Sequence, residues 1–273
     1  MIYFPNSKIN LGLNIIEKRP DGYHNIESVF YPIPLEDVLE IRENDREKNH
    51  IEITGYKVDG DLSDNLCLTA YNVMAKRFES LPKVNIHLHK SIPLGAGLGG
   101  GSSDASYTLL LLNYIFNLGL NKEELLEIAR EISADSAFFI ENKPVYAYNR
   151  GDEFKEIDFS LQGKYLLLIK PDIFVSTKEA YSQIEPKKSN KDIRDILSQD
   201  IGSWKYELKN DFETSLAKKY KDFVEIKDVL YDLGAEYVSL SGSGSTMYGI
   251  FNQAPNQDDI QNIDHPFIKL IQL

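Results

Sequence analysis

Apolar and polar residues alternate over much of the first ninety residues, and this pattern predicts β-strands. Ile9, Leu11 and Leu13 fall at every second position within residues 2–16, which predicts a strand, a loop and a second strand. Further strands are predicted at residues 29–41, 51–56 and 84–88. In the last of these, polar residues separate the apolar ones, so we expect a sheet with one wet face.

Four segments instead have the three- and four-residue apolar spacing of amphipathic helices. They are residues 65–78, 105–116, 122–133 and 223–233. Short strands are predicted at residues 144–148, 165–169, 237–240 and 247–251. The mixed-charge stretch 187–198 predicts an exposed helix or loop. The mixture predicts an α+β chain with a soft boundary near 150–160, which divides it into an N-terminal domain (1–155) and a C-terminal domain (156–273).

Composition sets limits on function. The 273 residues are 42% hydrophobic, and 30 Lys and Arg against 42 Asp and Glu give a formal charge of −12. A negative surface repels polyphosphate, so nucleic acid is not expected as a partner, although local donors can still bind a small anion. The single cysteine, Cys67, allows no internal disulfide and fits the cytoplasm. We expect neither a signal peptide nor a membrane span.

The most distinctive stretch is IPLGAGLGGGSSDAS, residues 92–106, with five glycines between positions 95 and 101. A flexible linker would join two separate folded units, whereas this run connects a predicted strand directly to a periodic helix. Residues 95–100 satisfy G-x-G-x-x-G, but the preceding strand alternates and no acidic residue follows about 20 residues later, which disfavours a dinucleotide site. A Walker A loop would need Gly-Lys-Ser/Thr, and no lysine stands there.

One physical feature common to those motifs remains. Consecutive backbone N–H groups that lead into a helix form a concavity that binds anions. Ser102 and Ser103 are expected to add hydroxyls and to cap the helix. For Asp104 two roles stay open: a charge that complements the helix dipole, which is favoured, or an indirect role through Mg²⁺.

Three stretches, in this order, resemble the GHMP kinases (galacto-, homoserine, mevalonate and phosphomevalonate kinases). They are PNSKINLGLN at 5–14 with KRPDGYH at 18–24, PLGAGLGGGSS at 93–103, and LSGSGST at 240–246. The resemblance covers essentially the whole chain. The KRPDGYH segment narrows it to the members that phosphorylate a cytidine diphosphate-linked methylerythritol in the non-mevalonate route to isoprenoid precursors.

The resemblance implies a cytoplasmic kinase that uses ATP and Mg²⁺ to phosphorylate the 2-hydroxyl of this small molecule. It implies a two-domain α+β fold with a left-handed βαβ crossover in the N-terminal half, a ferredoxin-like C-terminal half, and an active site in the cleft between them. The chain would be a monomer or a weak homodimer. The family's catalytic lysine and aspartate fall on Lys8 and Asp135, whose ordinary roles would be a surface lysine and a helix cap.

The same resemblance assigns binding residues. Tyr23 and His24 would contact the cytosine, and Tyr181 would stack on it, although a turn that packs an aromatic is the alternative. The full substrate set is Asn10, Tyr23, His24, Tyr181, Gly242 and Gly244, the last two in what could also be a plain hairpin turn. The ATP set is Asn65, Lys90, Pro93, Leu94, Gly95, Ala96, Gly97, Leu98, Gly99, Gly100, Gly101, Ser102 and Ser103, and no metal ligand is assigned.

Around the aspartate the sequence departs from the family pattern. Where Gly-Ala/Ser-Asp-Val/Ile-Pro-Phe-Phe is usual, the chain has SADSAFF at 133–139, which keeps the acid but changes its neighbours. His87 and His89 are expected to face solvent, because no third metal ligand stands nearby. Two other functions stay open. Another small-alcohol kinase is disfavoured by KRPDGYH, and a non-catalytic sensor is disfavoured by the presence of Lys8 and Asp135.

Overall fold

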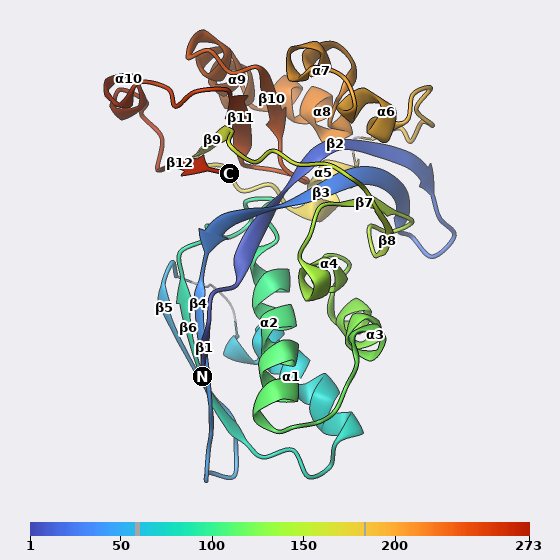
Figure 1. Cartoon of the computed structure of the whole chain (residues 1–273), viewed down its shortest axis with the longest axis vertical. Coiled ribbons are helices and arrows are strands. Elements are labelled where there is room, and N and C mark those ends of the chain that lie inside the picture. The colour runs from blue at the N-terminus through green and yellow to red at the C-terminus, as the bar shows by residue number, and fades with distance from the viewer. Residues whose placement is uncertain (58–60, 183) are drawn as a thin grey trace. The chain divides into compact units, whose positions relative to one another are not determined.

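The computed structural model of the chain describes residues 1–57, 61–182 and 184–273, which form two compact units (Figure 1). Unit 1 comprises Met1–Lys8, Pro34–Leu94 and Gly99–Lys143. Unit 2 comprises Ile9–Ile33, Gly95–Leu98 and Pro144–Leu273. The chain passes from one unit to the other several times, and within the glycine-rich loop Gly95–Leu98 belong to unit 2 while the residues on either side belong to unit 1.

The sheet of unit 1 has the strand order β1 (Ile2–Tyr3), β4 (Val38–Glu43), β6 (Val84–Lys90), β5 (His50–Gly55). β5 is parallel to β6, and helix α1 (Leu66–Arg77) lies between them in the chain, so the three form a βαβ unit. Along β6 the apolar residues are buried while His87 and His89 are exposed. The prediction of a sheet with one wet face, and of histidines that face solvent, is confirmed.

Among the described residues, unit 1 also contains α2 (Gly100–Ile115), α3 (Lys122–Ile132), α4 (Ser136–Glu141) and a short 3-10 helix, η1 (Leu62–Asp64), just before α1. α2 packs against α1 and β4 (Figure 1). The predicted start of α2 at residue 105 and its serine cap are wrong, because Gly99 occupies the N-cap position with a left-handed φ of 72°. The helix therefore begins within the glycine-rich run, and Ser102 and Ser103 lie in its first turn.

The two long strands β2 (Asn6–Lys18) and β3 (His24–Glu36) form another sheet with β7 (Val145–Tyr148) and β8 (Glu153–Glu156), in the order β2-β3-β7-β8. Both long strands carry residues of both units. The single strand predicted over 29–41 is divided into β3 and β4 at Asp37, a fully buried residue whose N–H donates to the carbonyl of Pro5.

The remaining sheet lies within unit 2. It has the order β10 (Tyr237–Leu240), β11 (Met247–Phe251), β9 (Tyr165–Lys170), β12 (Phe267–Gln272), and every neighbouring pair is antiparallel. Five helices lie between β9 and β10 in the chain: α5 (Thr177–Ser182), α6 (Ile193–Leu197), α7 (Ile201–Glu207), α8 (Asp211–Lys219) and α9 (Asp222–Asp232). Helix α10 (Gln257–Gln261) lies between β11 and β12. Along the chain this part of unit 2 therefore runs strand, helices, strand, strand, helix, strand.

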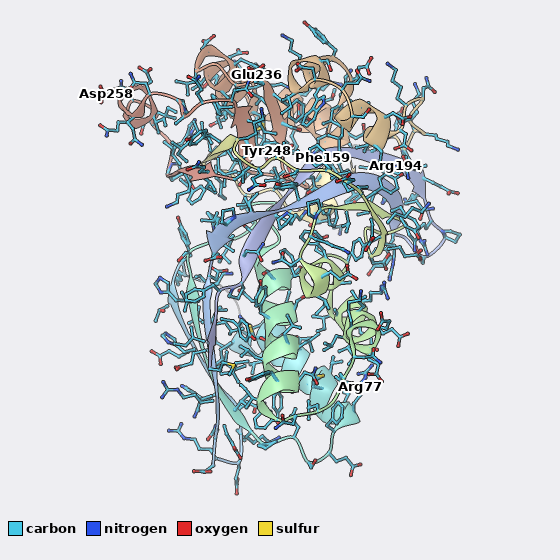
Figure 2. All side chains as sticks on the ribbon, in the orientation of Figure 1. Arg77, Phe159, Arg194, Glu236, Tyr248 and Asp258 are labelled. Atoms are coloured by element: carbon cyan, nitrogen blue, oxygen red, sulfur yellow. The ribbon has the colours of Figure 1, made fainter. Side chains whose placement is uncertain are left out.

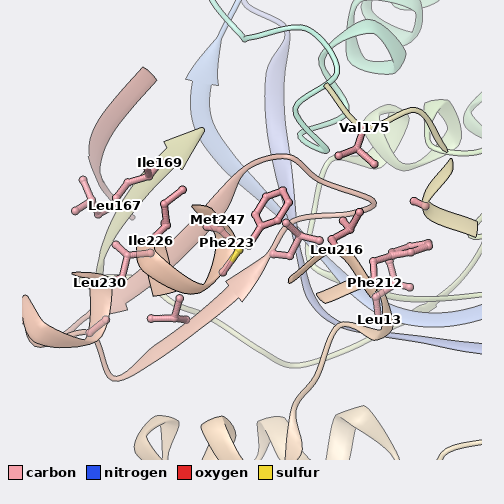
Figure 3. Close-up of a cluster of buried hydrophobic side chains, with 14 of the residues drawn as sticks. Leu13, Leu167, Ile169, Val175, Phe212, Leu216, Phe223, Ile226, Leu230 and Met247 are labelled. Carbon is pink, nitrogen blue, oxygen red and sulfur yellow. The ribbon is translucent and has the colours of Figure 1, made fainter. Parts of the chain in front are cut away.

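The core of unit 2 is formed by apolar side chains from this sheet and from α8 and α9 (Figure 3). Phe212, Phe223 and Met247 are among its fully or nearly fully buried members. The expectation of an exposed stretch at 187–198 is wrong in part, since α6 buries Ile193 and Ile196.

Charged side chains lie mainly outside the cores. Arg77, Arg194 and Asp258 are exposed, whereas Tyr248 is fully buried (Figure 2). Within the described residues, no helix is both long and apolar enough to cross a bilayer.

Candidate active site

Lys8 and Asp135 form an ion pair in unit 1. Lys8 lies on β2, Asp135 directly precedes α4, and Lys8 Nζ is 3.3 Å from Asp135 Oδ2. The Lys8 side chain is 3% exposed and that of Asp135 is 32% exposed. Asp135 occupies the N-cap position of α4, yet its side chain makes no capping hydrogen bond. A buried ammonium thus offsets the charge of a carboxylate that a ligand can still reach.

The glycine-rich loop approaches this pair at Gly99. A Cβ at Gly99 would lie 3.0 Å from Phe139 Cζ and 3.3 Å from Lys8 Cε, so a side chain would press on both. Gly99 also has a positive φ, as do Gly95 and Gly97 before it. Only glycine adopts three such backbone positions without strain. The loop therefore needs its glycines for both backbone shape and space.

The start of α2 presents backbone donors that have no partner within the helix. The first helical hydrogen bond runs from the Ser103 N–H to the Gly99 carbonyl at 2.9 Å. The N–H groups of Gly100, Gly101 and Ser102 precede it and have no acceptor within the helix. Such groups, at the positive end of a helix dipole, suit an anion such as a phosphate. Ser103 adds a fully buried hydroxyl oxygen that has no hydrogen-bond partner among the described residues.

Lys90 lies in a buried cluster with two aspartates. Its ammonium is bonded to Asp37 and lies 2.7 Å from Asp104 Oδ2, and all three side chains are at most 4% exposed. Asp37 also accepts the N–H groups of Ser91 and Ile92 at 2.6 and 2.8 Å. Burial lowers the pKa of Lys90, but the two carboxylates outweigh it and the net pKa is raised. Burial raises the pKa of Asp104, opposed by Lys90 and helped by the charge of Asp37.

This cluster bears on two sequence-based expectations. The Lys90 ammonium, expected at the nucleotide, is occupied by two carboxylates inside unit 1. Asp104 is paired with Lys90 rather than acting only through the helix dipole. Asn65, the other expected nucleotide contact outside the loop, caps α1: its side-chain oxygen accepts the Cys67 N–H at 2.9 Å. Asp37 was missed, and nothing in its local sequence marks it.

In unit 2, residues 95–98 of the loop pack against the loop between β10 and β11. The Ser241 hydroxyl donates to the Gly97 carbonyl at 2.8 Å, and the Thr246 N–H donates to the Ala96 carbonyl at 3.2 Å. A Cβ at Gly97 would lie 2.0 Å from the Ser241 carbonyl oxygen, and one at Gly242 would lie 3.1 Å from the Gly97 carbonyl oxygen. The two glycine-containing loops thus meet backbone to backbone.

Asn10 lies beside the second of these loops. Its Nδ2 donates to Ser28 Oγ at 2.8 Å, and a Cβ at Gly242 would lie 3.5 Å from its Oδ1. The side chain is 1% exposed. The structure therefore brings together Asn10, Gly97 and Gly242. Gly244 also approaches the glycine-rich loop, since a Cβ at Gly97 would lie 3.0 Å from the Gly244 carbonyl oxygen, while a Cβ at Gly244 itself would meet Leu240 and Leu216.

The expected base-binding residues form an aromatic group in unit 2. The rings of His24 and Tyr181 are stacked, with centroids 4.6 Å apart and an interplanar angle of 23°, and Phe212 supports Tyr181 edge-on at 4.9 Å. Burial, with a smaller effect of Lys18, lowers the pKa of His24, so its imidazole is neutral at neutral pH. A neutral imidazole offers one N–H donor and one nitrogen acceptor, and the edge of a pyrimidine carries groups that can pair with either. Tyr23, next to it, is 58% exposed.

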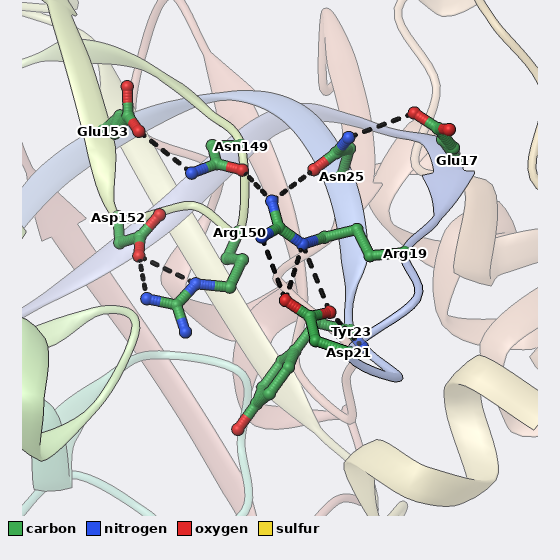
Figure 4. A network of polar contacts seen from close by, with 9 residues as sticks. All are labelled: Glu17, Arg19, Asp21, Tyr23, Asn25, Asn149, Arg150, Asp152 and Glu153. Carbon is green, nitrogen blue, oxygen red and sulfur yellow. Dashed lines mark hydrogen bonds and ion pairs between the residues drawn. The ribbon is translucent and has the colours of Figure 1, made fainter.

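A polar network holds the turn that carries Tyr23 and His24 (Figure 4). The Arg19 guanidinium is bonded to Asp21 at 2.9–3.2 Å, to Asn25 Oδ1 at 3.0 Å and to Asn149 Oδ1. Asp21 Oδ1 also accepts the Tyr23 N–H at 3.1 Å. Arg19 and Asp21 belong to the KRPDGYH segment, so their presence in that motif was the available signal for this role.

Arg150 lies over the ring of the exposed Tyr23. Its guanidinium carbon is 5.4 Å from the centre of the Tyr23 ring, and the group is held by Asp152, with Arg150 Nε 3.0 Å from Asp152 Oδ2 (Figure 4). The sequence offered no sign of this residue, because the contact joins parts of unit 2 that are distant along the chain.

Family models match both parts of the chain. A model described as the GHMP kinases N terminal domain matches residues 65–143, and one described as GHMP kinases C terminal matches residues 187–266. Together they span more than half of the chain.

Two relatives that match almost the whole chain have the same name. The chain is 50% identical over 254 residues to a 4-diphosphocytidyl-2-C-methyl-D-erythritol kinase of Bacteroides fragilis, covering 92% of each protein. It is 47% identical over 272 residues to the protein of the same name in Cytophaga hutchinsonii, covering 97% of this chain and 100% of that one. A crystal structure of 4-(cytidine 5'-diphospho)-2C-methyl-D-erythritol kinase matches with a TM-score of 0.79 at 27% identity, over 96% of this chain and 92% of that one.

A more distant structure shares the fold alone. The mevalonate kinase of Methanococcus jannaschii has a TM-score of 0.65 at 15% identity, covering 99% of this chain and 96% of that chain.

Proposed function

The chain belongs to the GHMP kinase family, and we propose that it transfers the terminal phosphoryl group of ATP to the 2-hydroxyl of 4-diphosphocytidyl-2-C-methyl-D-erythritol. The products are ADP and the 2-phosphate, in the non-mevalonate route to isoprenoid precursors. The name shared by relatives of about this chain's length supports the substrate. One structural observation carries the chemistry: the buried Lys8 ammonium lies 3.3 Å from the accessible Asp135 carboxylate.

Asp135 acts on the attacking hydroxyl. As the bond between the 2-oxygen and the γ-phosphorus forms, the hydroxyl proton passes to the Asp135 carboxylate, and the bond from the γ-phosphorus to the bridging oxygen of ADP breaks. Proton transfer of this kind contributes roughly 10²–10⁴ in rate. Lys8 offsets the charge of the carboxylate and of the oxygen as it loses its proton. Most of the remaining work in phosphoryl transfer is positioning.

The ATP phosphates would be bound by the backbone N–H groups at the start of α2. Donors that a helix start holds in place cost little reorganisation when a ligand binds. Ser102 and Ser103 would add hydroxyls from the same turn. The amide nitrogen of Asn65 is the part of that side chain left for the nucleotide, since its oxygen caps α1.

Mg²⁺ would be held chiefly by ATP. Within the described residues, no group of three or more His, Cys, Asp or Glu could hold a metal ion. Asp104, the acid closest to the loop in sequence, already pairs with Lys90 inside unit 1. Mg²⁺ commonly keeps several waters and takes its remaining ligands from substrate phosphates. When bound, it offsets phosphate charge, while this chain supplies the amide donors around it.

The cytidine end of the substrate would bind in unit 2. The base would contact Tyr23 and His24 and stack on Tyr181, and Asn10 with Gly242 would contact the diphosphate or the sugar. One substrate would then engage residues of both halves of the chain, with domain limits near 1–155 and 156–273 and an active site in a cleft between them. As a further part of this proposal, β5, α1 and β6 form the left-handed crossover.

ADP release tests the proposed reaction. The purified chain is incubated with ATP and Mg²⁺ and with either the cytidine diphosphate-linked methylerythritol, mevalonate or homoserine. We expect turnover with the first alone, and equal turnover with mevalonate would overturn the proposal. Asp135→Asn should nearly abolish turnover and leave ATP binding measurable, because the pair with Lys8 acts in chemistry. Asp258→Asn, an exposed aspartate on α10, serves as the matched control and should retain native activity.

A further inference from the structure

Three serine hydroxyls connect the start of α2 to the segment that carries Asp135. Ser133 Oγ donates to Ser102 Oγ at 2.9 Å, and Ser133 Oγ lies 2.6 Å from Ser136 Oγ. We call Ser102, Ser133 and Ser136 the serine bridge. Ser106, one turn further along α2, strengthens the connection, since its hydroxyl oxygen lies 2.6 Å from the carbonyl oxygen of Ser136 and 2.9 Å from that of Ser102, and its single hydrogen is shared between the two.

The serine bridge has a direction. A hydroxyl has one hydrogen to donate. Because the hydrogen of Ser133 goes to Ser102, Ser136 must be the donor to Ser133. The hydrogen of Ser102 is then left for an acceptor outside the bridge, and none of the described residues accepts it. Ser102 is half-buried in the first turn of α2, where the N–H groups without a partner in the helix lie.

The bridge flanks Asp135 on both sides. Ser133 is the C-cap of α3 and Ser136 is the first residue of α4, so Asp135 lies in a two-residue connection between them. The carboxylate has no capping hydrogen bond to hold it. Its direction toward Lys8 therefore depends on the backbone around it, which the hydroxyls of Ser133 and Ser136 attach to α2.

The other end of α4 is also attached. Asn142, in a left-handed conformation with φ 54°, donates from Nδ2 to Asn6 Oδ1 at 2.7 Å. Asn6 lies on β2, two residues before Lys8. A helix of six residues has little stability of its own, so attachments at its ends decide where it lies. Asn142 sets α4 relative to the strand of Lys8, and the serine bridge sets it relative to α2.

We propose that Ser133 and Ser136 are positioning residues that hold Asp135 in its reactive place, and that ATP completes this arrangement by accepting the hydrogen of Ser102. The inference rests on the proposed kinase function. A phosphate oxygen that accepts from Ser102 polarises that hydroxyl and strengthens its bond from Ser133, since chains of hydrogen bonds reinforce one another. Nucleotide at α2 thereby stabilises the reactive position of Asp135.

The test is steady-state kinetics of Ser133→Ala, with the native chain measured first. We expect kcat to fall between about 2-fold and 10-fold, as for the loss of one net hydrogen bond at the transition state, with the KM for the cytidyl substrate unchanged. Ser136→Ala should have a smaller effect, because Ser133 still donates to Ser102. Ser133→Thr keeps the hydroxyl and should restore kcat. Ser198→Ala, which loses one exposed hydroxyl, is the matched control.

A double-mutant cycle separates positioning from simple structural support. If ATP acts through the bridge, the losses of kcat in Ser102→Ala and Ser133→Ala overlap, so the double variant is little worse than Ser102→Ala alone. Strictly additive losses, or a lowered melting temperature with native kcat in folded Ser133→Ala, would overturn the inference and leave the kinase function standing. A native chain without activity on the cytidyl substrate would overturn both.

Discussion

Replacing Lys90 by methionine removes one cation from a place that holds two carboxylates. The ammonium is 2% exposed, bonded to Asp37 and 2.7 Å from Asp104. Methionine has a similar length, so the variant mainly loses charge and hydrogen bonds. Breaking a buried pair by removing one partner costs about 3–5 kcal/mol, because a buried charge is left uncompensated. That is a large part of a total stability of about 5–15 kcal/mol.

The expected shift in melting temperature follows from this cost. A large domain loses about 2–4 °C per kcal/mol, so Lys90→Met should melt about 6–20 °C below the native chain. The deficit should grow with pH. Burial already raises the pKa of Asp104 and the charge of Lys90 opposes this, so without the cation the pKa of Asp104 rises further and the folded state keeps a proton that the unfolded state releases. The free energy of unfolding therefore falls as pH rises above about 4.

Thermal melts at pH 5.5 and 8, followed by circular dichroism, measure both effects. Lys76→Met, an exposed lysine on α1, is the matched control and should melt within about 1 °C of the native chain. Adding Asp104→Asn to Lys90→Met should recover part of the loss, because one carboxylate becomes neutral while Asp37 keeps the N–H groups of Ser91 and Ile92. A native melting temperature with a raised KM for ATP would refute this assignment, because Lys90 would then serve the nucleotide.

Three further predictions follow from single positions. Gly97→Ala places a Cβ 2.0 Å from the Ser241 carbonyl oxygen, so it should lower the urea midpoint of unfolding. The loss should be well beyond that of the control Gly119→Ala, because Gly119 has a similar positive φ but open space around it. Equal midpoints for the two variants would show that the close approach at Gly97 is unimportant. Because burial lowers the pKa of His24, the KM for the cytidyl substrate should stay constant from pH 8 to about 6.5 and rise at lower pH as the ring gains a proton. A KM that is constant down to pH 5 would contradict the role of a neutral His24 ring at the base. Burial raises the pKa of Asp104, so the folded state keeps a proton that the unfolded state releases above about pH 4, and this contribution to stability is lost as pH rises. Asparagine does not titrate, so the urea midpoint of Asp104→Asn, relative to that of the native chain, should improve from pH 5 to pH 8. A change in the opposite direction contradicts the raised pKa.

Local patterns predicted most of the secondary structure. The strands predicted at 237–240 and 247–251 have those bounds as β10 and β11, and the helix predicted at 122–133 is α3 within one residue. Alternation and helical spacing report which face of an element is buried, so they work where burial decides the element. The errors arose elsewhere. Gly99 caps α2 through backbone conformation without any side-chain signal.

The site could be predicted only where a motif marked it. Lys8 and Asp135 are far apart in the chain, and composition or spacing alone leaves them as a surface lysine and a helix cap. Their ion pair arises from packing of α4 near β2. Arg19 stands in a quoted motif, but its bond to Asn149 spans 130 residues. The serine bridge likewise joins residues 31 apart, which no local pattern records.

The identity of the product decides whether this chain is the kinase assigned to it. Phosphorus NMR of the reaction with ATP, Mg²⁺ and 4-diphosphocytidyl-2-C-methyl-D-erythritol should show one new phosphomonoester on the 2-oxygen, in equal amount to ADP, while the cytidyl diphosphate stays intact. Asp135→Asn should give no such signal. ADP without a phosphorylated cytidyl product, or phosphate on a different hydroxyl, would show that the assigned reaction is wrong.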